Sequence, residues 1–191
     1  MLKRLFDITV SLAFICILFP IFYIIIGTII KLTSAGPVLF RQQRSGLENK
    51  PFTCLKFRTM IVNDEADTLQ AAEDDKRITT VGRFLRKNSL DELPQFINVL
   101  KGDMSIVGPR PHMLYHTEMY SVLIPGYMCR LTVKPGITGV AQVLGYRGDT
   151  PELADMARRV KLDLWYVAHR SFKLDLYIFL YTLLDFLKMN N

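Results

Sequence analysis

The sequence predicts a membrane-anchored α/β protein, and three observations lead to this fold class. Residues 8–30 carry no charge, although Asp7 precedes them and Lys31 follows them. Two short strand patterns come next, joined by a turn that contains Gly and Asn. Much of the remaining chain has the apolar spacing of amphipathic helices. At 191 residues, the chain is long enough for one core with an appendage, but hardly for two full domains.

The charge balance is basic, with 24 Lys and Arg against 18 Asp and Glu, and six of the acids fall within residues 64–75. Such a surface attracts anions, which include nucleic acid, phosphorylated metabolites and acidic lipids. The three cysteines, Cys16, Cys54 and Cys129, are odd in number and lie in apolar settings. This usage is typical of reduced core residues, so we expect the catalytic part to face a cytoplasm.

The uncharged run has the length of a membrane-spanning helix, which needs about 20 apolar residues. Pro20 lies near its middle, and each half reaches only about one leaflet of a ~30 Å hydrocarbon core. Lys and Arg occur on both sides of the run, whereas a spanning helix normally has them mainly on one side. Two readings stay open on these grounds: a helix that kinks at Pro20 and returns, and a spanning helix that tolerates a proline.

The two strand patterns cover Val38–Gln43 and Phe52–Thr59. Alternation along the second strand puts Lys56 and Arg58 on the same face. Two neighbouring cations could bind a phosphate. They could equally be ordinary solvent-exposed charges on a strand. Next comes an acidic surface segment, and then residues 79–90. These predict a short helix with Val81, Phe84 and Leu85 on one side, and with Arg83, Arg86 and Lys87 directed to an anionic surface or site.

Asp91 and Glu92 are adjacent carboxylates in the stretch "NSLDELPQF". Ser89 and Glu92 have the spacing of a capping box, which is the commoner use of such a pair. Pro94 favours a helix that starts near Leu90 or Asp91 and ends at Gly102. A carboxylate at a helix N-terminus stays ionised, and it can attack phosphorus to give an acyl phosphate. Its neighbour can hold Mg²⁺ against a diphosphate.

Arg110 stands between two prolines in "GPRP". The prolines restrict the backbone, so the guanidinium is partly positioned for bidentate binding of phosphate. The alternative is that this Pro- and Gly-rich segment is an ordinary surface turn without a binding role. His112 and His116 have a spacing that suits a metal, but a third ligand is not obvious, which argues against a zinc site.

Two helical patterns end the chain. The first is opened by Pro151 and Glu152 and carries Leu153, Met156, Val160, Leu164 and Val167 on one side. The second contains "LYIFLYTLL" between Asp175 and Lys188. It is too short to span a membrane, so we expect it in the core or at the membrane interface.

These residues resemble the bacterial sugar transferases, the monotopic phosphoglycosyl transferases that act on polyprenyl phosphate. The resemblance runs nearly end to end, through "LKRLFD", "GPVLFRQQRSG", "FTCLKFRTM", "NSLDELPQFINVLKGDMSIVGPRP", "VKPGITGVAQV" and "LDLWYVAHRSFKLDL". It implies a catalytic pair at Asp91 and Glu92, with Asp91 as nucleophile and Glu92 helping to hold Mg²⁺. It also implies that Arg110 binds phosphate. The charge patterns of the strand and of the short helix predict the same role for Lys56, Arg58 and Arg86. Asp163 recurs in a family motif, where it either supports the active site or, more commonly, forms a surface ion pair.

The resemblance favours the re-entrant reading, with the kink at Pro20, although the family usually has Ser where this chain has Phe19. The expected fold is thus α/β and monotopic: a re-entrant helix hairpin in residues 1–36, then a catalytic unit in 37–191 with a small β-hairpin and interfacial helices. The expected location is the cytoplasmic face of a bacterial inner membrane.

The implied reaction moves a sugar 1-phosphate from a UDP-sugar to undecaprenyl phosphate and releases UMP through an aspartyl intermediate. It would be the first membrane step of polysaccharide or glycoconjugate assembly. The motif "GYRGD" at residues 145–149 resembles the branch that transfers hexose 1-phosphates. The expected partners are these substrates and anionic membrane lipid. We do not expect binding of nucleic acid, and the sequence leaves open whether the protein forms a homo-oligomer. Two alternatives remain: a metal-dependent phosphatase or pyrophosphatase for lipid phosphates, and a scaffold that only binds anionic lipid.

Overall fold

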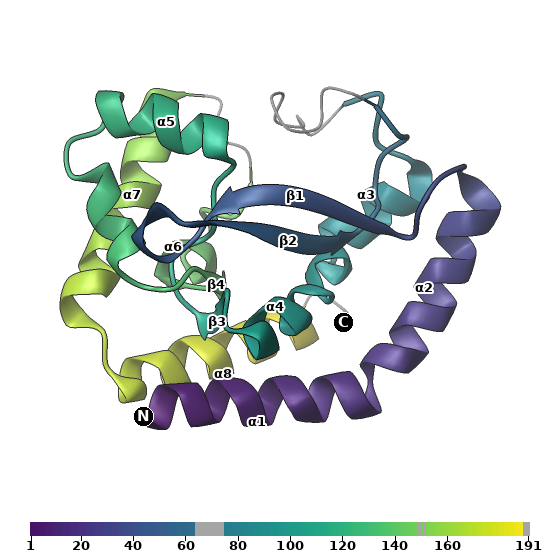
Figure 1. Ribbon diagram of the computed structural model, residues 1–191, viewed down its shortest axis with the longest axis horizontal. Helices are drawn as coiled ribbons and strands as arrows, with labels where there is room; N and C mark the ends of the chain where they lie inside the picture. The colour runs from purple at the N-terminus through teal and green to yellow at the C-terminus, as the bar shows by residue number, and fades with distance from the viewer. Residues whose placement is uncertain (64–74, 149, 151, 189–191) are drawn as a thin grey trace.

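The computed structural model describes residues 1–63, 75–148, 150 and 152–188, so most of the predicted acidic surface segment lies outside the described residues. The predicted mixture of helices with small sheets is confirmed. Helix α1 (Leu2–Ile17) lies along the base of the molecule, α2 (Phe19–Thr33) rises from its end, and a β-hairpin crosses above α1 (Figure 1).

The uncharged N-terminal run forms two helices, and the chain direction bends by 56° from the first helix to the second. Pro20 lies in the first turn of α2, where its missing N–H costs no hydrogen bond inside a helix. In the described part of the chain, no single helix is long and apolar enough to cross a membrane, and only this bent pair reaches that length and hydropathy together.

Helix α1 buries a polar stripe against the rest of the protein. Asp7 is 3% exposed and Ser11 0% exposed, and their spacing of four puts them on the face that also carries Lys3. The Asp7 Oδ1 accepts hydrogen bonds from Ser105 Oγ and from the backbone N–H of Ile106, both at 3.0 Å. The apolar N-terminal helix is therefore attached to a short strand of the interior by specific polar contacts.

The predicted hairpin is confirmed with small shifts at its ends. Strands β1 (Leu39–Ser45) and β2 (Pro51–Phe57) pair antiparallel, from Leu39 opposite Phe57 to Ser45 opposite Pro51. The 3₁₀ turn η1 (Leu47–Asn49) joins them, with Glu48 and Asn49 in the left-handed region. The expectation of core cysteines holds only for Cys54 on β2, because Cys16 and Cys129 are exposed.

Helix α3 (Thr80–Lys87) was predicted, and Thr79 caps it by accepting a hydrogen bond from the Gly82 N–H. Its apolar side is narrower than expected, since Leu85 is buried but Phe84 is 61% exposed. A Cβ on Gly82 would lie 1.9 Å from the carbonyl oxygen of Thr59. The glycine thus lets α3 lie directly on the backbone that follows β2.

A parallel strand pair that the sequence analysis missed lies in the centre. Strand β3 (Ser105–Val107) pairs with β4 (Gly136–Thr138), with Val107 opposite Thr138. Helix α4 (Gln95–Lys101) ends at Gly102, as predicted, and leads into β3. Both strands are too short for a period-two pattern to stand out. The main core cluster joins β2, α4 and β3 to the C-terminal helices.

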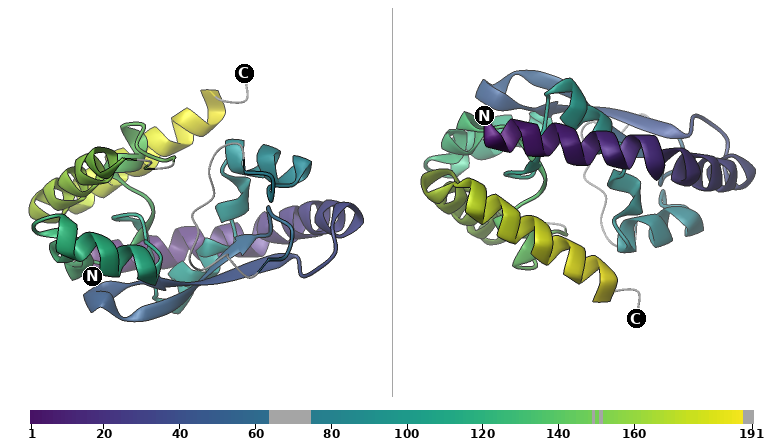
Figure 2. Two further views of the ribbon diagram at one scale, coloured as in Figure 1. Left: turned by 90° about the horizontal axis from the view of Figure 1, so that it is seen from above. Right: turned by 90° about the horizontal axis from the view of Figure 1, so that it is seen from below.

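The remaining helical elements lie mostly at one end of the molecule, and the last one runs back along its base (Figure 1). They are α5 (Leu114–Leu123), the 3₁₀ segment η3 (Tyr127–Thr132), α6 (Val140–Val143), α7 (Leu153–His169) and α8 (Phe172–Lys188). Figure 2 shows α8 on the same face as α1, close to it near the N-terminus and diverging from it. The ring of Phe6 contacts Phe172 and Phe179 at centroid distances of 5.9 and 5.2 Å.

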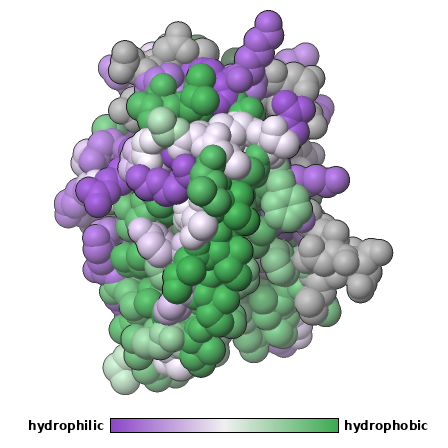
Figure 3. Space-filling view, turned by 90° about the vertical axis from the view of Figure 1, so that its right-hand side faces the viewer, coloured by the Kyte–Doolittle hydropathy of each residue, from purple (hydrophilic) through white to green (hydrophobic). Residues whose placement is uncertain are grey.

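Large apolar side chains are exposed over α2, where Ile24 is 67% and Leu32 81% exposed. Figure 3 shows hydrophobic residues gathered on this side of the molecule. Helix α8 has one buried side and one exposed side: Ile178 is buried in the core, and Tyr181 is exposed. Contiguous exposed apolar surface of this kind marks an interaction site rather than an ordinary protein surface.

Candidate active site

The two adjacent carboxylates lie in a tight turn between α3 and α4. Helical backbone starts at Leu90, as predicted, but only as a single 3₁₀ turn, η2 (Leu90–Glu92). Helix α4 begins later, at Gln95, with Pro94 as its N-cap. Asp91 therefore lies at the start of helical backbone, as predicted, but in the short 3₁₀ turn η2 and not in the longer helix α4.

The capping-box alternative for Glu92 is also excluded. Ser89 has a φ of 54° and makes no side-chain capping hydrogen bond. The Glu92 carboxylate instead faces two cations: its Oε1 lies 2.6 Å from both Lys56 Nζ and Arg110 Nη2, and its Oε2 lies 3.0 Å from Arg110 Nη1. The turn thus directs Glu92 away from the backbone and into the site.

The two carboxylates differ in state. Burial raises the pKa of Asp91, and the neighbouring Glu92 adds to this, while Lys56 opposes it. Burial acts in the same direction on Glu92, but the charges of Arg110 and Lys56 and their hydrogen bonds outweigh it and hold the pKa of Glu92 well below its usual range. Glu92 is therefore a fixed anion between two cations.

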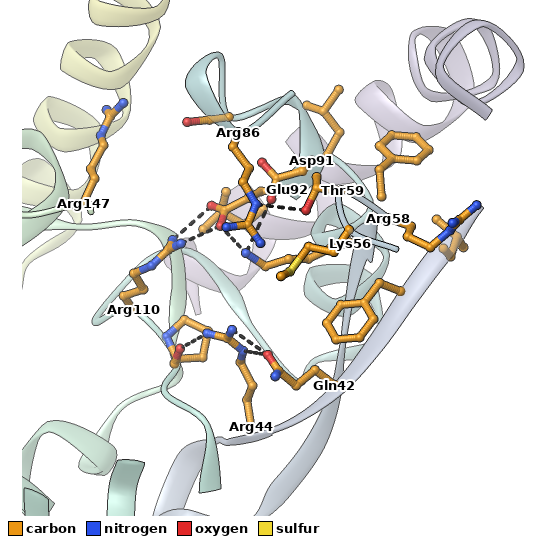
Figure 4. Close-up of a pocket in the computed structure, with 18 of the residues that line it drawn as sticks. Gln42, Arg44, Lys56, Arg58, Thr59, Arg86, Asp91, Glu92, Arg110 and Arg147 are labelled. Atoms are coloured by element: carbon orange, nitrogen blue, oxygen red, sulfur yellow. Dashed lines mark hydrogen bonds and ion pairs between the residues drawn. The ribbon is translucent and has the colours of Figure 1, made fainter. Parts of the chain in front are cut away.

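Asp91 is the less committed of the pair. Its only ion pair among the described residues is with Lys56 Nζ, at 3.7 Å, and within the same part of the chain its carboxylate accepts no hydrogen bond. The side chain lines a cavity of about 1140 Å³ together with Lys56, Arg86, Glu92 and Arg110. Figure 4 shows these side chains converging. An anionic ligand in this cavity would contact several cations and the Asp91 carboxylate, whose own contacts are weak.

The backbone that carries Arg110 is held by other elements of the fold. Four consecutive carbonyl oxygens, those of residues 109–112, each accept a hydrogen bond. The donors, in the same order, are Gly136 N at 2.9 Å, Arg130 Nη2 at 2.6 Å, Arg44 Nη1 at 2.6 Å and Ser45 N at 3.0 Å. Because both flanking prolines also fix φ near −65°, the segment has little freedom left, and the alternative of a surface turn is excluded.

Asp163 belongs to this support and is not part of a surface ion pair. Its Oδ2 accepts from Arg130 Nε at 3.0 Å and from Arg130 Nη2 at 2.7 Å. Both side chains are almost fully buried, at 2% and 0% exposed. Asp163 on α7 therefore orients the guanidinium that holds the Arg110 carbonyl.

The other predicted phosphate ligands have different surroundings. Arg86 lines the cavity, with its Nε 2.9 Å from Thr59 Oγ1. Arg58 points away from the acidic pair (Figure 4). Its guanidinium donates to the carbonyl oxygens of Pro37, Ala35 and Ser34 at 2.6, 2.6 and 2.9 Å. The expected pairing of Lys56 and Arg58 is not formed, because β2 ends at Phe57 and Arg58 closes the connection between α2 and β1 instead.

No local sequence pattern marks Arg44, Arg130 or Gly136, which hold the Arg110 segment. Arg130 is buried and Arg44 is half-buried, and neither differs in the sequence from any other basic residue. The unusual signal near Arg130 is the apolar setting "GYMCRLTV", because a cation there needs a buried partner.

The spacing of His112 and His116 raised the question of a metal site. Among residues 1–63, 75–148, 150 and 152–188, no group of three or more His, Cys, Asp or Glu side chains could hold a metal ion. Burial and nearby arginines lower the pKa of His112 well below its usual value, so its ring is neutral.

Comparisons with known proteins agree with the motifs. The sequence model of a family described as bacterial sugar transferase matches residues 1–189. A Klebsiella pneumoniae protein named UDP-glucose:undecaprenyl-phosphate glucose-1-phosphate transferase is 52% identical over 94% of this chain and 39% of its own length. A Caulobacter vibrioides protein of the same name is 46% identical over 99% of this chain and 71% of its own. An Aeromonas hydrophila protein named UDP-N-acetylgalactosamine-undecaprenyl-phosphate N-acetylgalactosaminephosphotransferase is 42% identical over 93% and 41%. The chain thus spans about two fifths of the length of several curated relatives.

The buried Arg130–Asp163 pair gives a stability prediction. Asp163→Asn leaves the Arg130 charge uncompensated, so we expect it to lower the free energy of unfolding by about 3–5 kcal/mol. Asp155→Asn on the same helix is the matched control, because among the described residues Asp155 is paired only with the exposed Arg158, at 3.9 Å. We expect less than about 1 kcal/mol for the control. Denaturant unfolding in detergent measures both, and equal effects would contradict a structural role for the buried pair.

Proposed function

This chain belongs to the bacterial sugar transferase family, and from this premise we propose that it transfers a hexose 1-phosphate from a UDP-sugar to undecaprenyl phosphate and releases UMP. Relatives named as UDP-glucose:undecaprenyl-phosphate glucose-1-phosphate transferases support the donor and the acceptor. The motif at residues 145–149, which resembles that of the hexose branch, supports the sugar class.

One observation carries the proposal: the adjacent carboxylates have opposite surroundings beside the cations of one cavity. Glu92 is held by Lys56 and Arg110, whereas Asp91 has a single ion pair at 3.7 Å. A nucleophile must be free to leave its own contacts, and an orienting group must not. Asp91 fits the first role and Glu92 the second.

In the proposed reaction, an Asp91 oxygen attacks the phosphorus that carries the hexose. The bond from this phosphorus to the bridging oxygen breaks, and UMP leaves with that oxygen and the electron pair. An oxygen of undecaprenyl phosphate then attacks the phosphorus of the aspartyl phosphosugar. This step gives undecaprenyl diphosphate hexose and restores the Asp91 carboxylate.

The cations would stabilise the phosphoryl group while it is transferred. A guanidinium has five N–H donors, and Arg110 uses two of them on Glu92, which leaves three for phosphate oxygens. Lys56 lies between the two carboxylates, so it can contact the group that Asp91 attacks. Arg86 adds positive charge on the side of α3. Preorganised cations of this kind usually contribute the largest share of such catalysis.

We also propose Mg²⁺ as the cofactor. Mg²⁺ is usually bound by one or two carboxylates together with substrate phosphates and water. One oxygen of Asp91 fits this donor set and leaves the other for the attack on phosphorus, whereas both oxygens of Glu92 already face Arg110 or Lys56. Asp91 is therefore the better ligand of the two, and Glu92 would act mainly by holding the cations in place. The ion would neutralise the charge of the diphosphate.

The 56° bend, the exposed apolar residues of α2 and the basic residues on both sides of the N-terminal run support a re-entrant anchor. We propose a monotopic protein on the cytoplasmic face of a bacterial inner membrane, with residues 1–36 as the anchor and 37–191 as the catalytic unit. The exposed side of α8, on the same face as α1, would lie at the lipid surface.

The reaction is tested by release of UMP from UDP-hexoses in the presence of Mg²⁺ and undecaprenyl phosphate. We expect release by the wild type and a loss of more than tenfold in Arg110→Lys, because lysine lacks the planar fork. Arg158→Lys, on the exposed side of α7, is the matched control and should keep its activity. Release of inorganic phosphate instead of UMP would favour the phosphatase alternative, and an inert wild type would favour the scaffold.

The topology is tested by cysteine labelling in intact cells. Cys16 and Cys129 are exposed and are first replaced by serine, and single cysteines are then introduced at Leu2 and Lys50. A re-entrant anchor predicts that both sites react only with a reagent that enters the cytoplasm. Reaction of the Leu2 site with an impermeant reagent would mean that the helix spans the membrane.

A further inference from the structure

The cavity extends beyond the acidic pair to a second wall at the ends of the parallel strands. Residues 108–112 follow β3 and residues 139–142 follow β4, and the two strands pair in parallel, with Val107 opposite Thr138. Their chain continuations therefore leave the same end of the pair, where open α/β sheets commonly bind ligands. Arg110, His112 and Gln142 all line the cavity from this end.

Two side chains on this wall carry a buried polar atom without a partner. His112 and Gln142 are only 4% and 5% exposed. Within the described residues, neither His112 Nε2 nor Gln142 Oε1 has a hydrogen-bond partner. Buried polar atoms are nearly always hydrogen-bonded in native proteins, so such exceptions call for an explanation.

Both side chains are fixed by their other polar atom. His112 Nδ1 lies 2.6 Å from the Tyr127 hydroxyl, and Gln142 Nε2 donates to the Ile137 carbonyl oxygen at 2.6 Å. The second contact requires the amide nitrogen on the Ile137 side, so the unpaired atom of Gln142 is an acceptor. The unpaired nitrogen of a neutral histidine either donates or accepts, according to the tautomer.

The chemistry of this wall suits neutral hydroxyl groups. A hydroxyl both donates and accepts, so it can satisfy either atom. The nearby cation Arg147 is ion-paired with Asp185 at 3.0 Å, which makes it less suited to a phosphate. The Phe and Tyr side chains of the described lining, which could stack on a base, come from α2, β1, β2, α4 and α8 and not from residues 108–112 or 139–142. The wall therefore fits a sugar better than a uracil ring.

We propose that His112 and Gln142 bind hydroxyl groups of the hexose in the UDP-sugar donor. The inference rests on the proposed function and deepens it. Arg110 would hold the phosphate of the hexose phosphate, and His112, two residues further on, would contact the sugar attached to it. The hydrogen bonds to Tyr127 and Ile137 preorganise both contacts, so that the site favours sugars with hydroxyl groups at the matching positions.

The test uses two variants that each remove one unpaired atom and preserve the surroundings. His112→Asn keeps a polar atom near the Tyr127 hydroxyl but lacks Nε2, and Gln142→Met keeps the side-chain length but lacks Oε1. Gln43→Met is the matched control, because Gln43 is exposed on β1 outside the cavity. The measurements are kcat/KM for UMP release from UDP-glucose and UDP-galactose, and the inhibition constant of UMP.

We expect both cavity variants to lower kcat/KM for the preferred donor by about tenfold or more, with the UMP inhibition constant within about twofold of the wild type. The control should match the wild type in both measurements. Weaker inhibition by UMP in proportion to the loss of kcat/KM would overturn the inference, because the wall would then bind the uridine part. Unchanged kinetics, or loss of the folded state in both variants, would also overturn it. A wild type that releases no UMP from any UDP-hexose would overturn the proposed function itself.

Discussion

The active site depends on the backbone of residues 109–112, in which four consecutive carbonyl oxygens are bound by donors from other elements. Each such hydrogen bond contributes only about 1 kcal/mol, but together with two prolines they leave Arg110 one position. Two of the donors are arginine side chains, the half-buried Arg44 and the fully buried Arg130, and Arg130 is itself oriented by Asp163. Because Arg110 is fixed, it fixes Glu92, and the shared cation Lys56 then lies between Glu92 and Asp91. The unequal state of the two carboxylates follows from this arrangement.

The same segment is connected to the N-terminal helix through β3. One edge of β3 pairs with β4, and α1 supplies polar partners for β3 as well: Lys3 Nζ donates to the Val107 carbonyl oxygen at 2.9 Å, and Asp7 accepts from the Ile106 N–H. Arg4 adds hydrogen bonds to the carbonyl oxygens of Val99 and Leu100 at the end of α4. The helix that would lie in the membrane is therefore a structural part of the catalytic unit. This arrangement would hold the cavity at a constant depth relative to a lipid substrate.

Local patterns in the sequence predicted much of the fold, but long-range contacts decided the site. The hairpin, α3, the end of α4 at Gly102 and the break near Pro20 follow from turn residues, capping and proline chemistry, which act over a few residues. Strands β3 and β4 have only three residues each, too few for a period, so their pairing was not visible. The grouping of Asp91, Glu92, Lys56 and Arg110 was expected, whereas the orientation of Arg58 was not. Alternation along β2 put it beside Lys56, but the strand ends before it, and three carbonyl oxygens of the α2–β1 connection bind its guanidinium. The burial of Asp163 also required the partner Arg130, which no local pattern indicates.

The central claim is that Asp91 is the free carboxylate of the pair and bonds covalently to the hexose phosphate. Peptide mass spectrometry tests this claim most directly, on enzyme quenched after mixing with UDP-hexose and Mg²⁺ without undecaprenyl phosphate. The account predicts one hexose phosphate on the peptide that contains Asp91, formed together with an equal amount of UMP and absent from Asp91→Asn. An adduct on Glu92 would reverse the roles of the two carboxylates. Release of UMP only when both substrates are present, without any adduct, would mean that the lipid phosphate attacks the donor directly, and it would contradict the account.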